Sequence, residues 1–98
     1  MKVLIGVDIG TQGTKAFLFS EEGNCLSSAF AKSKLYRPAD GVVEEDPERQ
    51  VDTVCQTIRG CVRKAGIGAS SVAAIGIAGQ MAGIIGVGEG GRNITPYD

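Results

Sequence analysis

Histidine is absent from this sequence, and its charges are close to balanced. Without histidine, these 98 residues cannot hold a Ser-His-Asp triad, a histidine-ligated zinc ion or an imidazole acid or base. Ten Lys and Arg residues against eleven Asp and Glu residues give a net charge of -1, so no broad positive surface forms for polyanions. We therefore expect neither nucleic acid nor a membrane among the partners.

Cysteine is also scarce: Cys25, Cys55 and Cys61 form no CxxC pair. On one helix, Cys55 and Cys61 would be turned about 240° from each other and could not bridge, which favours free thiols in a reducing compartment. Asp8 cuts off the first apolar run, residues 3–7, which is too short for a signal peptide. No stretch approaches the ~20 apolar residues of a membrane span. We expect a cytoplasmic location.

The length allows one hydrophobic core and excludes a complete two-domain enzyme. Apolar residues make up 43% and charged residues 21%, which is typical of a folded chain rather than a disordered one. We therefore expect residues 1–98 to belong to one folded domain.

Three apolar runs with short connections predict an antiparallel meander of strands at residues 3–9, 15–19 and about 25–36. The first two runs are apolar on both faces, which is typical of buried strands. Residues 72–79 form another continuous apolar run, and a helix before it predicts a right-handed crossover onto a parallel neighbour.

Between these strands, Asp46 and Pro47 predict a helix start, and Gly66 predicts a left-handed cap at the end. Capping and solvation explain the acidic residues around 40–52 better than a metal site does. The expected buried stripe of the helix is Val51, Val54, Cys55, Ile58, Val62 and Ala65.

Near the end of the chain, residues 86–91 spell the dinucleotide pattern G-x-G-x-x-G, but no helix follows. We interpret residues 88–93 as a hairpin turn after a strand at 82–87. The expected fold is thus α/β, in the order βββαβ followed by a β-hairpin. One helix covers at most one face of such a sheet, so we expect either further chain or self-association into a homo-oligomer.

A turn with two glycines, Gly10 and Gly13, follows Asp8 at the end of the first strand. Glycine lets backbone amides approach a phosphate closely, and an aspartate can hold Mg²⁺ through its water shell. An ordinary hairpin explains the same residue types equally well. The candidate residues for binding a polyphosphate are Asp8, Gly10, Thr11, Gln12, Gly13, Thr14 and Lys15, with Asp8 as the metal-directing carboxylate.

Residues 6–16 resemble the first phosphate motif of the sugar-kinase/Hsp70/actin superfamily. Residues 43–48, 74–81, 89–92 and 95–96 extend this resemblance in order, and the whole chain is similar to the N-terminal part of an FGGY-family carbohydrate kinase, nearest to xylulokinase-like members. The resemblance implies part of a ribonuclease-H-like (actin-like ATPase) domain. It also implies transfer of the γ-phosphoryl group of ATP, with Mg²⁺, to a sugar or polyol hydroxyl.

By the same resemblance, Gln80, Met81 and Ala82 would lie at the sugar pocket. Ala82 stands where xylulokinases commonly have histidine, Gln12 where a small hydroxyl residue is common, and Gln50 and Val51 where tryptophans are often found. The family's general base, second phosphate loop and adenosine pocket lie further along, so we expect this piece to be inactive alone. Two alternatives remain: a small non-catalytic oligomerising module, or an ATP-binding piece from an acetate-kinase-like or chaperone-like branch.

Overall fold

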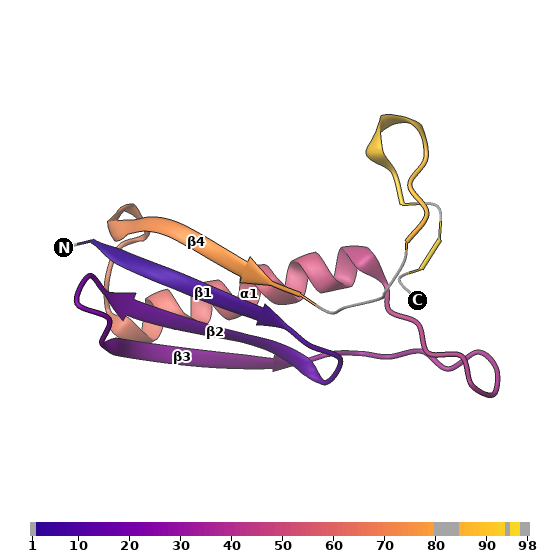
Figure 1. Ribbon diagram of the computed structural model, residues 1–98, viewed down its shortest axis with the longest axis horizontal. Coiled ribbons are helices and arrows are strands. Elements are labelled where there is room, and N and C mark those ends of the chain that lie inside the picture. Colours follow the sequence, from indigo (N-terminus) through magenta and orange to yellow (C-terminus); the bar gives the residue numbers. More distant parts are fainter. Residues whose placement is uncertain (1, 80–84, 94, 97–98) are drawn as a thin grey trace.

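The computed structural model describes residues 2–79, 85–93 and 95–96. They form a four-stranded sheet in the order β3-β2-β1-β4, with one long helix on one face (Figure 1). The main elements in chain order are β1 (Val3–Ile9), β2 (Gly13–Ser20), β3 (Cys25–Lys32), α1 (Pro47–Ala65) and β4 (Val72–Ala78). Short 3-10 helices lie at Ala69–Ser71 and Glu89–Gly91. The predicted order βββαβ is confirmed.

The pairing of the strands also follows the prediction. β1 pairs with β2, and β2 with β3, both antiparallel, while β4 pairs parallel with the other edge of β1. Because β1 and β4 run in the same direction, their carboxyl ends meet at one edge of the sheet, where Asp8 is opposite Ala78. The turn between β1 and β2 lies at this edge too (Figure 1).

α1 begins and ends at the predicted capping residues, Asp46 and Gly66. The side chain of Asp46 accepts a hydrogen bond from the backbone N–H of Glu48 at 3.1 Å. Gly66 adopts the left-handed conformation, with φ of 68°, and its N–H donates to carbonyls of the last turn. The predicted helix is therefore confirmed at both boundaries. Among the described residues, no helix has the length and apolar character needed to cross a membrane.

One hydrophobic core lies between α1 and the sheet. α1 packs mainly against β3 and β2, and less closely against β1. The thiol of Cys61 donates to the carbonyl oxygen of Ala16 at 3.1 Å, and the carbonyl of Cys61 accepts from the hydroxyl of Ser27 at 2.8 Å. The buried apolar residues of this core are Val3, Ile5, Val7, Ala16, Leu18 and Cys61.

The face of α1 that packs against the sheet departs from the predicted stripe at Val51 and Cys55 only. The other four predicted residues pack against the core: Val54, Ile58, Val62 and Ala65. Thr57 and Cys61 are the buried residues of the helix, whereas Val51 is 62% exposed and Cys55 is exposed. Since α1 lies over β2 and β3, the face directed at those strands includes Thr57 and Cys61 rather than Val51. All three cysteines are free, as expected.

The expectation that the strands are buried on both faces is wrong. In β1, Val3 and Ile5 are buried while Leu4 between them is 43% exposed. In β4, Ile77 is 64% exposed although it points to the same side as buried Val7. The reason is that α1 covers one face of β3, β2 and β1, and no described element covers the other face or β4.

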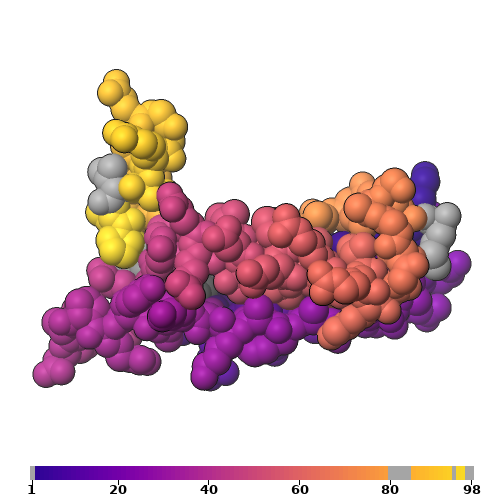
Figure 2. All heavy atoms as spheres, turned by 180° about the vertical axis from the view of Figure 1, so that it is seen from behind, coloured from indigo at the N-terminus to yellow at the C-terminus, as the bar shows by residue number. Residues whose placement is uncertain are grey.

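Two strand boundaries also need correction. β3 ends at Lys32 rather than near Tyr36, because Lys32 is paired with Gly13, the first residue of β2, and no β2 residue remains to continue the ladder. Of the strand expected at residues 82–87, residues 82–84 lie outside the described part. Val87 forms an isolated bridge with Asn93 around a turn with positive φ at Gly90 and Gly91. The described residues of this segment, 85–93 and 95–96, project from the sheet and helix (Figure 2).

Candidate functional site

The candidate site is the turn that joins β1 to β2. Ile9 and Thr14 form the last cross-strand pair, and the N–H of Gly10 donates to the carbonyl of Gly13 at 2.9 Å. Thr11 and Gln12 form the tip of this turn and are exposed. The tip therefore presents two polar side chains to solvent at the carboxyl end of β1.

Ser33 fixes the turn from the end of β3. Its backbone N–H donates to the carbonyl of Gln12 at 3.0 Å, and its hydroxyl donates to the carbonyl of Gly10 at 3.4 Å. The carbonyl oxygens of Gly10 and Gln12 thus both accept hydrogen bonds from Ser33, on the side of the turn that faces β3. No local sequence pattern identifies Ser33, because only the pairing of Lys32 with Gly13 brings it to the turn.

The two glycines of the turn differ in what surrounds them: an added Cβ at Gly10 would meet only the Gly13 carbonyl oxygen at 3.4 Å, whereas Gly13 has closer neighbours. The glycines with positive φ are found elsewhere in the described chain, so neither Gly10 nor Gly13 uses the left-handed region. At Gly13, an added Cβ would lie 2.5 Å from both the carbonyl oxygen of Ala31 and Cζ of Phe30. Gly13 is therefore required by the close approach of β3 to the turn.

Asp8 and Lys15 lie on the face of the sheet opposite α1. They are cross-strand partners in the β1–β2 register, and both are exposed. Because Asp8 is exposed, its carboxylate can reach a ligand in solvent. One anionic and one cationic side chain therefore lie on adjacent strands beside the turn, in contact with solvent.

Thr14 departs from the expected set of phosphate contacts. It is only 2% exposed, because it lies on the same side of β2 as buried Ala16 and Leu18, under α1. Its hydroxyl is therefore not available to a ligand in solvent, and that part of the expectation is corrected. The remaining predicted residues, Gln80, Met81 and Ala82, lie outside the described residues.

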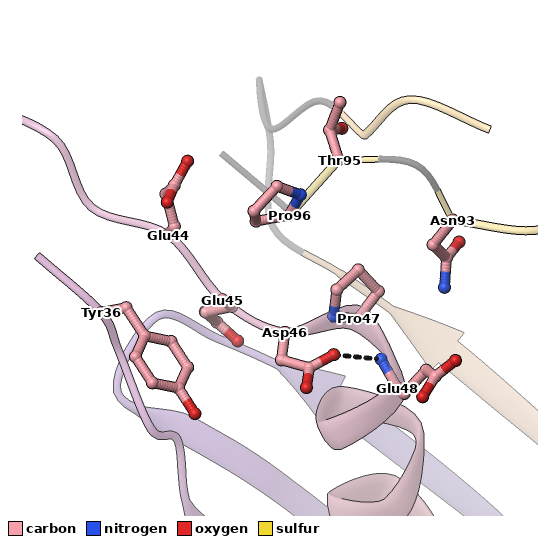
Figure 3. Close-up of a pocket in the computed structure, with 9 residues that line it drawn as sticks. All are labelled: Tyr36, Glu44, Glu45, Asp46, Pro47, Glu48, Asn93, Thr95 and Pro96. Carbon is pink, nitrogen blue, oxygen red and sulfur yellow. Dashed lines mark hydrogen bonds between the residues drawn. The ribbon is translucent and has the colours of Figure 1, made fainter. Parts of the chain in front are cut away.

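A separate pocket of about 410 Å³ lies at the start of α1 (Figure 3). Two of its acidic side chains already have partners: Asp46 caps the helix, and Glu45, only 5% exposed, accepts from the side-chain amide of Gln50 at 2.6 Å. Gln50 stands at a position where the resemblance implied tryptophan, and this partly buried hydrogen bond gives the departure a structural role. The pocket is lined by Tyr36, Glu44, Glu45, Asp46, Pro47, Glu48, Asn93, Thr95 and Pro96.

The metal-binding potential of the acidic residues can be judged from their grouping. Within the ranges that the structure describes, no three or more Cys, Asp or Glu side chains gather closely enough to hold a metal ion. A metal ion at Asp8 would therefore have a single protein carboxylate in its coordination shell, and water and a bound ligand would fill the other positions.

Comparison with known proteins identifies the family. Residues 3–97 match the FGGY family of carbohydrate kinases, N-terminal domain. A glycerol kinase from Sinorhizobium fredii is 39% identical over 77 residues, which are 79% of this chain and 16% of that protein. The chain thus spans about a sixth of the length of such relatives.

Solved structures agree with this match. A ligand-bound xylulose kinase from Lactobacillus acidophilus superposes with a TM-score of 0.90 at 32% identity, over 99% of this chain and 19% of that one. A gluconate kinase from the same organism gives a TM-score of 0.89 at 32% identity, over 98% and 19% of the two chains. The predicted partial actin-like ATPase fold is confirmed by these neighbours. The chain belongs to the FGGY family of carbohydrate kinases, to whose N-terminal domain it corresponds.

Proposed function

We propose that this chain supplies the first phosphate-binding hairpin of a kinase that transfers the γ-phosphoryl group of ATP to a hydroxyl of a sugar or polyol. The observation that carries the proposal is the exposed Asp8 carboxylate at the end of β1, beside a turn whose Thr11 and Gln12 face solvent. Phosphoryl transfer depends mainly on positioning and charge stabilisation, which such a hairpin provides.

Asp8 fits a role in directing Mg²⁺. Mg²⁺ keeps much of its water shell and binds through one or two carboxylates together with substrate phosphates, so a single solvent-facing carboxylate suits it. When bound, the ion would neutralise charge on the phosphates of ATP. Lys15, the cross-strand partner of Asp8, would add a cation beside the same phosphates.

The turn would contribute hydrogen-bond donors. The hydroxyl of Thr11 and the amide of Gln12 lie at the exposed tip of the turn. In the reaction, the substrate hydroxyl oxygen forms a bond to the γ-phosphorus as the bond to the bridging oxygen of ADP breaks. We assign the base that accepts the hydroxyl proton to a part of the enzyme beyond these residues, so the 98-residue chain alone would be inactive.

Gln80, Met81 and Ala82 are our candidates for the sugar side of the site. Since an alanine side chain forms no hydrogen bond, we infer that polar contacts to the substrate come from elsewhere. The printed names of the relatives include glycerol, xylulose and gluconate kinases, which makes these three compounds the first substrates to test. The three free cysteines favour a reducing compartment, and we propose the cytoplasm.

The test replaces the matching N-terminal segment of the Lactobacillus acidophilus xylulose kinase with this chain and measures ADP release. We expect an active chimera, and at least about hundredfold lower kcat after Asp8→Asn. Lys2→Gln, a charge change at the opposite end of β1, is the control and should leave kcat unchanged. An Asp8→Asn chimera of full activity would refute the role of Asp8.

Two measurements test the 98-residue chain by itself. It should phosphorylate none of the three compounds above background, and calorimetry should show weak binding of Mg-ATP. Micromolar affinity for Mg-ATP, or measurable turnover, would contradict the proposal that this chain is an incomplete site.

A second candidate, a non-catalytic module that self-associates, is favoured by the exposed apolar side chains on both faces of the sheet. Phe30 is 56% exposed, Ile75 45% and Ile77 64%. Uncovered apolar surface of this kind promotes association. Sedimentation velocity tests it: dimers or larger species are expected, and a strictly monomeric chain would exclude the module.

A further inference from the structure

A second feature of the turn is a groove of about 550 Å³ on its β3 side. Lys32 is paired with Gly13, and Phe30 with exposed Lys15, which places both β3 side chains on the face of the sheet opposite α1. The groove therefore opens on the face that the helix leaves uncovered. It is lined by Thr11, Gln12, Phe30, Lys32, Ser33, Leu35 and Arg37.

The charge of this groove is of one sign. Lys32 and Arg37 are both exposed, and no carboxylate is among the lining residues. The whole chain has a net charge of -1, so this local excess of positive charge does not follow from a basic composition. The arrangement favours an anion, and Arg37 offers the planar donor set that matches a phosphate.

The hydrogen bonds of Ser33 make the turn compatible with an anion. Carbonyl oxygens repel an anionic ligand, and the carbonyls of Gly10 and Gln12 are both engaged by Ser33. The side chains of Thr11 and Gln12 supply neutral donors on the rim of the groove.

Phe30 gives the groove a firm apolar wall. Its ring lies over Gly13, where an added Cβ would be 2.5 Å from Cζ of Phe30. Even so, 56% of Phe30 is exposed, and Leu35 lines the groove beside it. A ligand with a carbon skeleton attached to its anionic group would therefore contact apolar surface as well as the two cations.

We propose that this groove binds the phosphate group of a phosphorylated small molecule, with Lys32 and Arg37 as the charged contacts and Phe30 against the carbon skeleton. A sugar phosphate and a nucleotide share this chemistry. Thr11 and Gln12 belong to both the turn proposed for ATP and the rim of this groove, whereas Lys32 and Arg37 lie outside the phosphate motif. The proposed binding requires neither phosphoryl transfer nor a metal ion.

The test is a titration of the ¹⁵N-labelled chain with inorganic phosphate, glycerol 3-phosphate and AMP, each in EDTA, followed by amide chemical shifts. We expect saturable shifts at Thr11, Gln12, Lys32 and Arg37. In K32Q/R37Q, Kd should rise at least about tenfold, because two charge-assisted contacts to the phosphate are lost. Tighter binding of glycerol 3-phosphate than AMP would indicate a sugar phosphate, and the reverse order a nucleotide.

The matched control is K2Q/R59Q, which removes the same charge from exposed positions away from the groove. Its Kd should stay within about twofold of the parent chain. An equal loss in both double variants would show general attraction to positive charge and overturn the proposal, as would the absence of saturable shifts. Asp8→Asn should leave this metal-free binding intact, so failure of the kinase proposal and failure of this one give different results.

Discussion

The backbone N–H of Ser33 donates to the carbonyl oxygen of Gln12 at 3.0 Å, although Ser33 lies just past the last residue of β3. This bond connects an unpaired segment to the tip of the candidate phosphate turn. We expect the Ser33 amide to exchange with solvent at least about tenfold more slowly than that of Lys34, which follows it. Hydrogen exchange measured by NMR gives both rates in one experiment.

Ser33→Ala is the informative variant, because it keeps the backbone donor and removes only the hydroxyl that reaches Gly10. The slow exchange at position 33 should persist in this variant. Equal rates at residues 33 and 34 in the parent chain would show that the turn is not held by β3.

Gly13→Ala should destabilise the fold by about 2–3 kcal/mol, measured by urea denaturation. The new methyl group would lie 2.5 Å from the carbonyl oxygen of Ala31 and from Cζ of Phe30. Phe30→Ala in the same chain should recover only part of the loss, because the Ala31 carbonyl belongs to the backbone and cannot move aside alone.

Gly76→Ala serves as the matched control for that prediction. Gly76 also lies in a strand, but nothing is found within 4 Å of an added Cβ there. Since alanine is favoured over glycine in a strand interior, stability should stay the same or rise slightly. A comparable loss at positions 13 and 76 would contradict the steric explanation.

The sequence predicted the features that depend on neighbouring residues. Asp46 with Pro47, and Gly66 at the other end, are sufficient to place α1, because capping acts within one turn of the helix. The position of Asp8 at the end of the first strand, directly before the turn, also follows from the local sequence.

What the sequence did not predict depends on contacts between distant elements. Residues 15–19 are apolar on both sides, so the pattern could not show that Thr14 faces α1 while Lys15 faces solvent. Phe30 and Ser33 reach the turn only through the β2–β3 register, which no local pattern encodes. The burial of Cys61 instead of Cys55 likewise follows from where α1 crosses the sheet.

Asp46→Ala should lower the free energy of unfolding by about 1 kcal/mol, because it removes the acceptor for the Glu48 N–H at the helix start. Asp46→Ser should restore most of it. Asp52→Ala, at an exposed position inside α1, is the control for loss of an acidic charge and should change stability by less than about 0.5 kcal/mol. If both alanine variants lose the same amount, charge and not capping is responsible.

Cys61 makes the stability of the fold sensitive to high pH. Burial raises the pKa of the Cys61 thiol above its ordinary value of 9.0, because the thiolate would lose its hydration. The folded state therefore holds the proton more tightly than the unfolded state. The contribution to stability is complete below pH 9.0 and is lost as the pH rises towards the folded-state pKa.

The measurement compares C25A/C55A, in which Cys61 is the sole thiol, with C25A/C55A/C61A in urea denaturation at pH 7 to 10. Above pH 9, the free energy of unfolding of C25A/C55A should fall more steeply with pH than that of C25A/C55A/C61A. Below pH 9, the two proteins should show the same dependence on pH. Ellman's reagent supplies an independent readout: exposed Cys25 and Cys55 of the parent chain should react at once, and Cys61 only as the chain unfolds. Equal reaction of all three thiols at pH 8 in the folded protein would show that α1 does not hold Cys61 against Ala16.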